Sequence, residues 1–458
     1  MNKVSRRDVL ASLAMAGASS LAGRADDELL AQGAKIVPKQ PMSVAARKQA
    51  ADVLVKYFGG TAPQLLRPAE GVLRHPSVAP SLPGKEYATS LWDWDTLWTS
   101  RGLFRYAAAG DPELHRRVGE HAQGSLLNFL DHQSEEGRIP IMMSVSNPDP
   151  FGCLKKRPAP NSQNQAKPVM GQLALLVADE MKDVAWLASR FDQLLRFYDS
   201  WTVDNKSSIG LLVWGNDVAI GNDNDPTTFG RPSFSSANLL LNCLYYQDLV
   251  AGGVLAGRLG RAQDAERLAG RARELGAAIQ RYCWDERDRF YYTVDVQCVD
   301  RRAELIPDVK RGMAMSWSCL PLRMQVFTGF LPMWCGIATQ EQAKDLVRLH
   351  YMNEGSFHAE AGVRSLSRAE SMYSLEFSSN PSNWLGPVWI IVNYLVWAGL
   401  KRYGFEAEAK DLADKTLRLL ADDISKSGSL NEYYHPDTGA PLSHRGFMDW
   451  NLLVLEML

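Results

Sequence analysis

The sequence predicts an all-α fold, a single ring of paired helices with long loops. Three observations support this prediction. Stretches that are apolar on every face alternate with stretches that carry one apolar stripe, strand-like segments are few, and the loops between the pairs are long. A helix that is apolar all round is buried, whereas a helix with one stripe lies at a surface. The alternation therefore indicates an inner ring of helices wrapped by an outer ring.

Three pairs of helices can be assigned along the chain. Each pair consists of a buried segment followed by a striped one: 168–181 with 183–201, 237–256 with 264–284, and 387–402 with 405–424. In the second striped segment Leu268, Ala272, Leu275 and Ile279 recur at helical spacing. Only 289–297 and 211–214 resemble strands. We therefore expect one all-α domain over 26–458.

Long loops rich in Pro, Gly and Asn separate the helices. They cover 59–90, 138–168, 202–234, 303–335, 353–386 and 425–446. Loops of this size in a compact domain are usually functional. In a ring of helices alternate loops converge on one mouth, so residues far apart in sequence can form one site.

The composition narrows the range of functions. Apolar residues make up 46% of the 458, charged residues 22%, and the net charge is -2. This is ordinary globular composition, without the basic excess that nucleic-acid binding requires. No run of 18 uninterrupted apolar residues occurs, so we expect no membrane span. The 13 Trp partly cluster beside Asp and Asn, at 92–95 and 383–389. Such clusters suit core packing, and they also suit a pocket for sugar rings, whose apolar faces lie on indole.

The N-terminus resembles an export signal. Ser5-Arg6-Arg7-Asp8-Val9-Leu10 precedes an Ala/Gly-rich apolar run, and Ala25 offers a cleavage point. A twin-arginine pair before such a run predicts a Tat-type signal over 1–25 and a periplasmic or secreted protein. The alternative is an ordinary N-terminal helix with a chance Arg pair.

The six cysteines show no metal-binding spacing, and we expect neither metal nor cofactor. Cys243 and Cys319 lie in apolar surroundings typical of buried free thiols. An oxidising compartment would permit a disulfide, and Cys283 with Cys298 is a candidate pair across a hairpin.

Two carboxyl residues in long loops are candidates for acid–base chemistry. Inverting hydrolysis of a glycosidic bond needs a protonated acid and a basic carboxylate, about 6.5–9.5 Å apart. Asp223 lies in Gly221-Asn222-Asp223-Asn224-Asp225-Pro226, which would also suit a plain turn or an incomplete calcium loop. Glu432 lies among aromatic residues before a Pro-Asp-Thr-Gly turn, which would also suit a short strand entering a turn.

Several motifs in order along the chain resemble the catalytic barrel of glycoside hydrolase family 63. The bacterial mannosylglycerate and glucosylglycerate hydrolases belong to this group, and trehalases are more distant relatives. The matching segments are Trp92-Asp93-Trp94-Asp95, Asn164-Gln165-Ala166-Lys167-Pro168, Gly221 to Pro226, Trp384-Leu385-Gly386-Pro387-Val388-Trp389, 432–439 and Phe447-Met448-Asp449-Trp450. The resemblance implies an (α/α)6 barrel that cleaves an α-linked glucoside or mannoside with inversion.

The resemblance also implies roles for single residues. Asp223 would be the general acid and Glu432 the general base. The substrate-binding residues would be Trp92, Trp94, Asp95, Gln165, Trp384, Gly386 and Trp389. Asp95 and Gln165 would bind hydroxyls, and the tryptophans would stack on the ring. Asp217 and Asp225 remain alternative acids if the loop register is shifted.

The chain departs from its relatives at two positions, and rival functions stay open. Leu385 and Thr227 stand where relatives usually have Arg, so glycerate specificity is not implied. Another toroidal enzyme, a polysaccharide lyase or an epimerase using His358 and His435, is one alternative. A sugar-binding protein without catalysis is another. The sequence has no G-x-S-x-G elbow and no H-E-x-x-H motif, which disfavours acyl and zinc hydrolysis.

Overall fold

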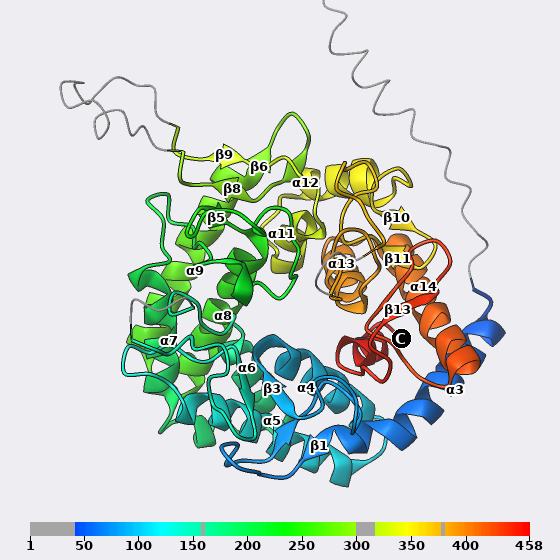
Figure 1. Ribbon diagram of the computed structural model, residues 1–458, viewed down its shortest axis with the longest axis horizontal. Helices are drawn as coiled ribbons and strands as arrows, with labels where there is room; N and C mark the ends of the chain where they lie inside the picture. Colours follow the sequence, from blue (N-terminus) through cyan, green and yellow to red (C-terminus); the bar gives the residue numbers. More distant parts are fainter. Residues whose placement is uncertain (1–41, 157–160, 299–316, 377–380) are drawn as a thin grey trace, which may run out of the picture.

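The computed structural model describes residues 42–156, 161–298, 317–376 and 381–458, which form a ring of helices in two layers (Figure 1). The proposed signal over 1–25 lies outside the described residues. Inner helices contact one another around the ring, and outer helices cover them. The predicted all-α ring is confirmed.

The inner ring is made of six elements in the described part of the chain. They are α4 (Asp93–Ala107), α6 (Met170–Glu180), α8 (Leu239–Arg258), α11 (Leu331–Cys335), α13 (Ile390–Arg402) and the 3-10 helix η6 (Trp450–Glu456). Each contacts the next, and η6 packs against both α13 and α4. The C-terminal segment therefore closes the inner ring.

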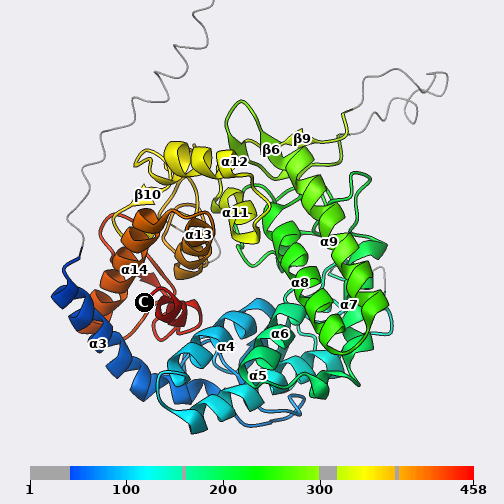
Figure 2. The same ribbon diagram turned by 180° about the vertical axis from the view of Figure 1, so that it is seen from behind.

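The outer ring alternates with the inner one along the chain. Its elements are α3 (Val44–Thr61), α5 (Pro112–Asp131), α7 (Phe191–Val203), α9 (Ala262–Cys283), α12 (Gln340–Asp345) with a following π-helical turn (Leu346–Tyr351), and α14 (Glu406–Ser427). Helices α3 and α14 lie side by side and close this layer (Figure 2). An ion pair between Arg47 of α3 and Asp414 of α14 joins them.

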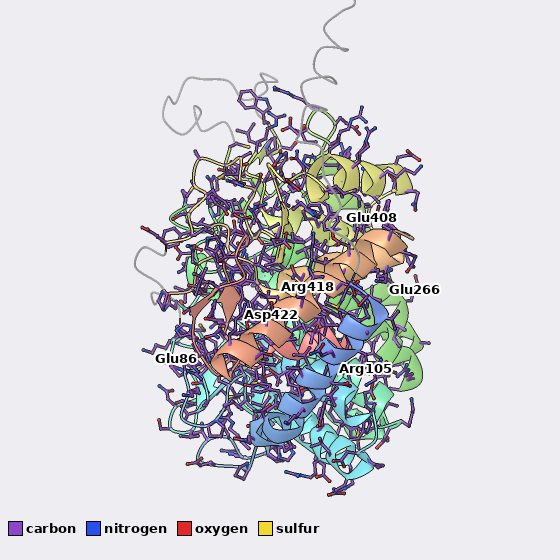
Figure 3. The ribbon with its side chains drawn as sticks, turned by 90° about the vertical axis from the view of Figure 1, so that its right-hand side faces the viewer. Glu86, Arg105, Glu266, Glu408, Arg418 and Asp422 are labelled. Atoms are coloured by element: carbon purple, nitrogen blue, oxygen red, sulfur yellow. The ribbon has the colours of Figure 1, made fainter. Side chains whose placement is uncertain are left out.

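The distribution of apolar residues explains the difference between inner and outer helices. Helix α8 buries residues on every face, whereas α9 buries chiefly the stripe from Leu268 to Cys283. Asn238 caps α8 by accepting from the backbone N–H groups of Leu240 and Leu241. Figure 3 shows Arg418 and Asp422 on the outward side of α14. Helix α8 is long and apolar enough to cross a membrane, yet 72% of its most apolar 18-residue stretch is buried inside the protein. It is the core helix that the pattern predicts.

The strands are short and lie in the loops. They are β1 (Leu66–Arg67), β2 (Ser77–Val78), β3 (Ser90–Trp92), β4 (Met142–Ser144), β5 (Ser236–Ala237), β6 (Trp284–Asp285), β7 (Phe290–Tyr291), β8 (Val294–Asp295), β9 (Leu320–Pro321), β10 (His358–Ala359), β11 (Gly362–Val363), β12 (Tyr433–Tyr434) and β13 (Pro441–Ser443). Each pairing among them is antiparallel. Val388 bridges to both Arg364 and Tyr434, which ties three loops together at one end of the barrel.

Several local predictions need correction. The striped segment 183–201 begins with a 3-10 turn, Ala185–Leu187, and α7 starts only at Phe191. The strand expected over 289–297 is split between β7 and β8, which belong to different sheets, and 211–214 is not a strand. The loop predicted over 303–335 contains the inner helix α11, which is too short for a periodic pattern.

The cysteine pairing is also corrected. All six cysteines are free, and the candidate pair Cys283 and Cys298 is not bonded. Cys283 ends α9 inside the core, whereas Cys298 lies beyond β8 and is half-buried. Cys243 is buried as predicted, and Cys319 is only partly buried.

Candidate active site

One end of the barrel carries an open pocket whose empty space, including the solvent at its mouth, is about 530 Å³. It opens where the inner helices begin, because its walls come from β3 and the first turn of α4 and from the loops before α6, α8 and α13. Glu432, the residue before β12, and Trp450 of η6 also contribute to the wall. Seven of the nine predicted site residues line it: Trp92, Trp94, Asp95, Asp223, Trp384, Trp389 and Glu432. Seven further residues, which the sequence did not predict, also line the pocket: Tyr87, Ile141, Lys167, Val218, Gly221, Ser382 and Trp450.

Stacked aromatic rings form much of the wall. The rings of Trp384 and Trp389 lie 3.9 Å apart at 9°, and the ring of Trp450 packs edge-on against both. The indole N–H of Trp389 donates to the Asn383 carbonyl at 2.9 Å. That of Trp450 donates to the Glu432 carbonyl at 3.1 Å. A hydrogen bond as well as ring packing therefore fixes the orientation of each of these two indoles.

The loop that carries Asp223 is held by the carboxyl group of Asp225. Asp225 is buried and accepts from the side-chain amides of Asn222 at 2.7 Å and Asn238 at 3.0 Å, and from both the N–H and the hydroxyl of Thr227. Burial raises the pKa of Asp225, and these donors oppose the rise. These contacts of Asp225 are internal to the fold, so its arrangement is that of a structural residue rather than of an alternative acid.

Asp217, the other alternative acid, is also away from the pocket lining. It lies on a 3-10 turn and accepts from the Gly230 N–H at 3.2 Å. The two departures from the family pattern lie away from the lining as well. Thr227 is bonded within the loop, and Leu385 packs against the core. Neither is among the residues that line the pocket.

Glu432 reaches the pocket from the residue before strand β12. Its backbone N–H donates to the Ser443 carbonyl at 3.0 Å, and its carboxylate accepts from Nδ1 of His444. Burial raises the pKa of Glu432, and the hydrogen bond from His444 opposes this rise. The same hydrogen bond raises the pKa of His444. Sequence reasoning missed His444, because nothing in the local pattern connects it with Glu432.

A buried ion pair lies under Trp94. Lys167 Nζ is 3.0 Å from Asp93 Oδ1, donates to the Ala219 carbonyl at 3.3 Å and lies 5.2 Å from the centre of the Trp94 ring. Asp93 also accepts from the backbone N–H groups of Trp94 and Lys167, at 2.7 Å each. This pair joins the start of α4 to the loop before α6. Lys167 is in a segment that the resemblance had matched, but it had no predicted role.

Two predicted residues are not among those that line the pocket. Gln165 is buried and accepts from the Ser200 hydroxyl at 2.9 Å. Gly386 has a φ of +143°, and a Cβ there would lie 2.4 Å from the Tyr373 ring. Neither residue is among those that line the pocket, and each is engaged by a neighbour within the fold. Of the histidines considered for an epimerase, His358 contacts Lys415 at 2.7 Å and His435 caps its own turn. Neither lines the pocket.

The fold matches that of solved glycoside hydrolases. A solved structure of the GH63 mannosylglycerate hydrolase from Thermus thermophilus in complex with glucose superposes with a TM-score of 0.60 at 19% identity. The match covers 90% of this chain and 100% of the other. Neutral trehalase Nth1 from Saccharomyces cerevisiae gives a TM-score of 0.59 at 16% identity, covering 84% and 74%. These likenesses establish the (α/α)6 barrel.

The family model for the mannosylglycerate hydrolase MGH1-like glycoside hydrolase domain matches residues 116–448. The chain belongs to this family of glycoside hydrolase domains. Mannosylglycerate hydrolase MGH1 of Selaginella moellendorffii is 32% identical over 114 residues, 24% of this chain. The match spans only 20% of the length of that relative.

Proposed function

We propose that the protein is an inverting hydrolase of small α-linked glucosides or mannosides. In this mechanism Asp223 protonates the leaving oxygen and Glu432 activates a water on the opposite face of the sugar. The supporting observation is that these two carboxyl groups, on loops far apart in the chain, line one pocket walled by tryptophans. An aromatic wall excludes water and provides flat apolar surfaces for a sugar ring.

The surroundings of Glu432 fit the role of a base. A base must be ionised before the reaction, and burial alone would keep a carboxyl protonated. The Nδ1–H of His444 donates to the carboxylate and stabilises its charged form. The oxygen not bonded to His444 then remains available to a water. Asp95 would accept from a sugar hydroxyl at the same wall.

The test compares Asp223→Asn and Glu432→Gln with the matched control Asp217→Asn, which changes a carboxyl in the same loop outside the pocket. Loss of one acid–base group costs about 10²–10⁴-fold in rate. We expect at least a hundredfold loss of kcat/KM in the first two variants and near-normal activity in the control. Wild-type rates in either of the first two would remove that residue from the mechanism.

The substrate screen covers α-linked disaccharides, glucosylglycerate and mannosylglycerate, with NMR detection of the first product anomer. An α-linked substrate should release the β-anomer. Release of the α-anomer would contradict the single-displacement scheme. Turnover of any of these substrates would also exclude a sugar-binding protein without catalysis.

We also propose that the protein is exported through the Tat pathway. The support is the pair Arg6-Arg7 before an Ala/Gly-rich apolar run. In a bacterial host, replacing both arginines by lysine should retain the full-length chain in the cytoplasm. Unchanged export of that variant would contradict the proposal.

A further inference from the structure

Two carboxyl groups are in direct contact at the pocket wall. Asp95 lines the pocket, Asp449 lies fully buried behind it, and their side chains are hydrogen-bonded to each other. The Thr99 hydroxyl donates to Asp449 Oδ1 at 2.8 Å. Among the described residues no N–H or hydroxyl group donates to Asp449 Oδ2. Two ionised carboxylates cannot hydrogen-bond, so this contact requires a proton between them.

The charges around the pair favour keeping that proton. Burial raises the pKa of both carboxyl groups, and their mutual repulsion adds to the rise for Asp449. Asp93 raises the pKa of Asp95 further, and Glu432 raises that of Asp449. Lys167 acts in the opposite direction on Asp95, but its ammonium group is engaged by Asp93 at 3.0 Å.

The geometry also indicates which residue holds the proton. Asp95 lies in the first turn of α4, where unpaired backbone N–H groups and the helix dipole favour a negative charge. Asp449 precedes η6, and the N–H groups of Met448 and Asp449 both donate to the Pro80 carbonyl, at 2.8 and 2.9 Å. Thr99 occupies Oδ1 of Asp449 as a donor. The remaining oxygen, Oδ2, is therefore the site of the proton.

We propose that Asp449 is a positioning residue whose protonated carboxyl donates to Asp95 and holds Asp95 ready to accept from a sugar hydroxyl. The proposal rests on the proposed function, because it assumes a sugar in the pocket. Without the proton, two like charges in contact at a buried wall would repel each other, and Asp95 would turn away from its place. Asp449 itself does not touch the substrate.

Two variants of Asp449 distinguish the effect of its hydrogen bond to Asp95 from the effect of its side-chain volume. Asp449→Asn keeps a donor toward Asp95 and an acceptor for Thr99, whereas Asp449→Leu removes both at similar size. The probes are methyl α-D-glucoside and methyl α-D-mannoside for calorimetric binding, and the substrate found by the screen for kinetics. We expect the Asn variant to stay within about threefold of wild type and the Leu variant to raise KM about tenfold with a smaller change in kcat. A tenfold or greater weakening in the Asn variant would overturn the proposal.

A spectroscopic measurement tests the proton directly and does not depend on activity. At about pH 8 exposed carboxyls are ionised, so the infrared carbonyl band of a protonated carboxyl reports buried acids. We expect this band in the wild-type minus Asp449→Asn difference spectrum, and its absence would overturn the proposal.

The control for the binding experiment is Asp248→Asn, which changes a buried carboxyl between α6 and α8 and should leave sugar affinity unchanged. If Asp223→Asn and Glu432→Gln keep full activity, the proposed function fails, while the infrared result still decides the shared proton.

Discussion

Asn224 and Trp384 lie 160 residues apart in the chain and are joined by a 2.7 Å hydrogen bond from the Trp384 backbone N–H to the Asn224 side-chain oxygen. The Asn224 amide also donates to the side-chain oxygen of Asn383 at 3.1 Å. The residue after Asp223 is thus fixed to the segment that carries the stacked tryptophans. The proposed acid and the aromatic wall are held as one unit.

Asn224→Ala should therefore impair both folding and activity. It leaves the buried Trp384 N–H without a partner, which costs about 1–3 kcal/mol. We expect a lower free energy of unfolding and a loss of kcat of about tenfold, because a small misplacement of the acid is costly. The control is Asn205→Ala, another buried asparagine, which donates to the Val213 carbonyl at 2.8 Å. It should lower stability but not kcat. Equal kcat losses in both variants would contradict the coupling.

The variant His444→Phe tests whether His444 lowers the pKa of Glu432, the proposed base. The phenyl ring keeps the edge contact with Tyr87, and the donor to Glu432 is lost. Because that donor opposes the raised pKa of Glu432, its removal should raise the pKa further. The base must be ionised, so the acid limb of the kcat/KM profile should move to higher pH. His444→Gln, which restores a donor, should move it back. An unmoved acid limb in the Phe variant would show that His444 does not act on Glu432.

Gly221→Ala tests the start of the acid loop. Gly221 has a φ of +80°, and an added Cβ would lie 3.0 Å from Lys167 and 3.1 Å from the Trp94 ring. We expect a loss of about 1–2 kcal/mol from the left-handed backbone and, in addition, a raised KM because two pocket residues must shift. Gly230→Ala is the matched control, since its φ is +68° and nothing lies near its Cβ. The thermal unfolding temperature should fall in both variants, and KM should rise only in the first. A raised KM in both would contradict this reasoning.

Asp248→Asn should change how stability depends on pH. Burial raises the pKa of Asp248 from 3.8 to about 7. Between these values the folded state binds a proton that the unfolded state has lost, so stability falls as pH rises from about 4 to 7. The neutral Asn variant lacks this effect. Its free energy of unfolding relative to wild type should increase over that range, as measured by denaturant titration. A constant difference would contradict the raised pKa.

The local pattern of apolar residues was enough to predict many of the helices of the barrel. The buried helices α6, α8 and α13 were predicted with their striped partners because apolar periodicity is a property of consecutive residues. Helices such as α11 and η6 were not predicted, since they are too short to show a period. The proposed roles of Asp223 and Glu432 remain predictions, although the structure places both in one pocket.

The sequence by itself determined the all-α ring, the family and the tryptophan-rich loops, because helical periodicity and collinear motifs are readable along the chain. Only the tertiary structure decided which side chains meet. It brought His444 into hydrogen-bond contact with Glu432, Asp449 into contact with Asp95, and Gln165 into contact with Ser200. The physical reason is that these contacts depend on ring closure by η6 and on loop packing, which no local spacing encodes.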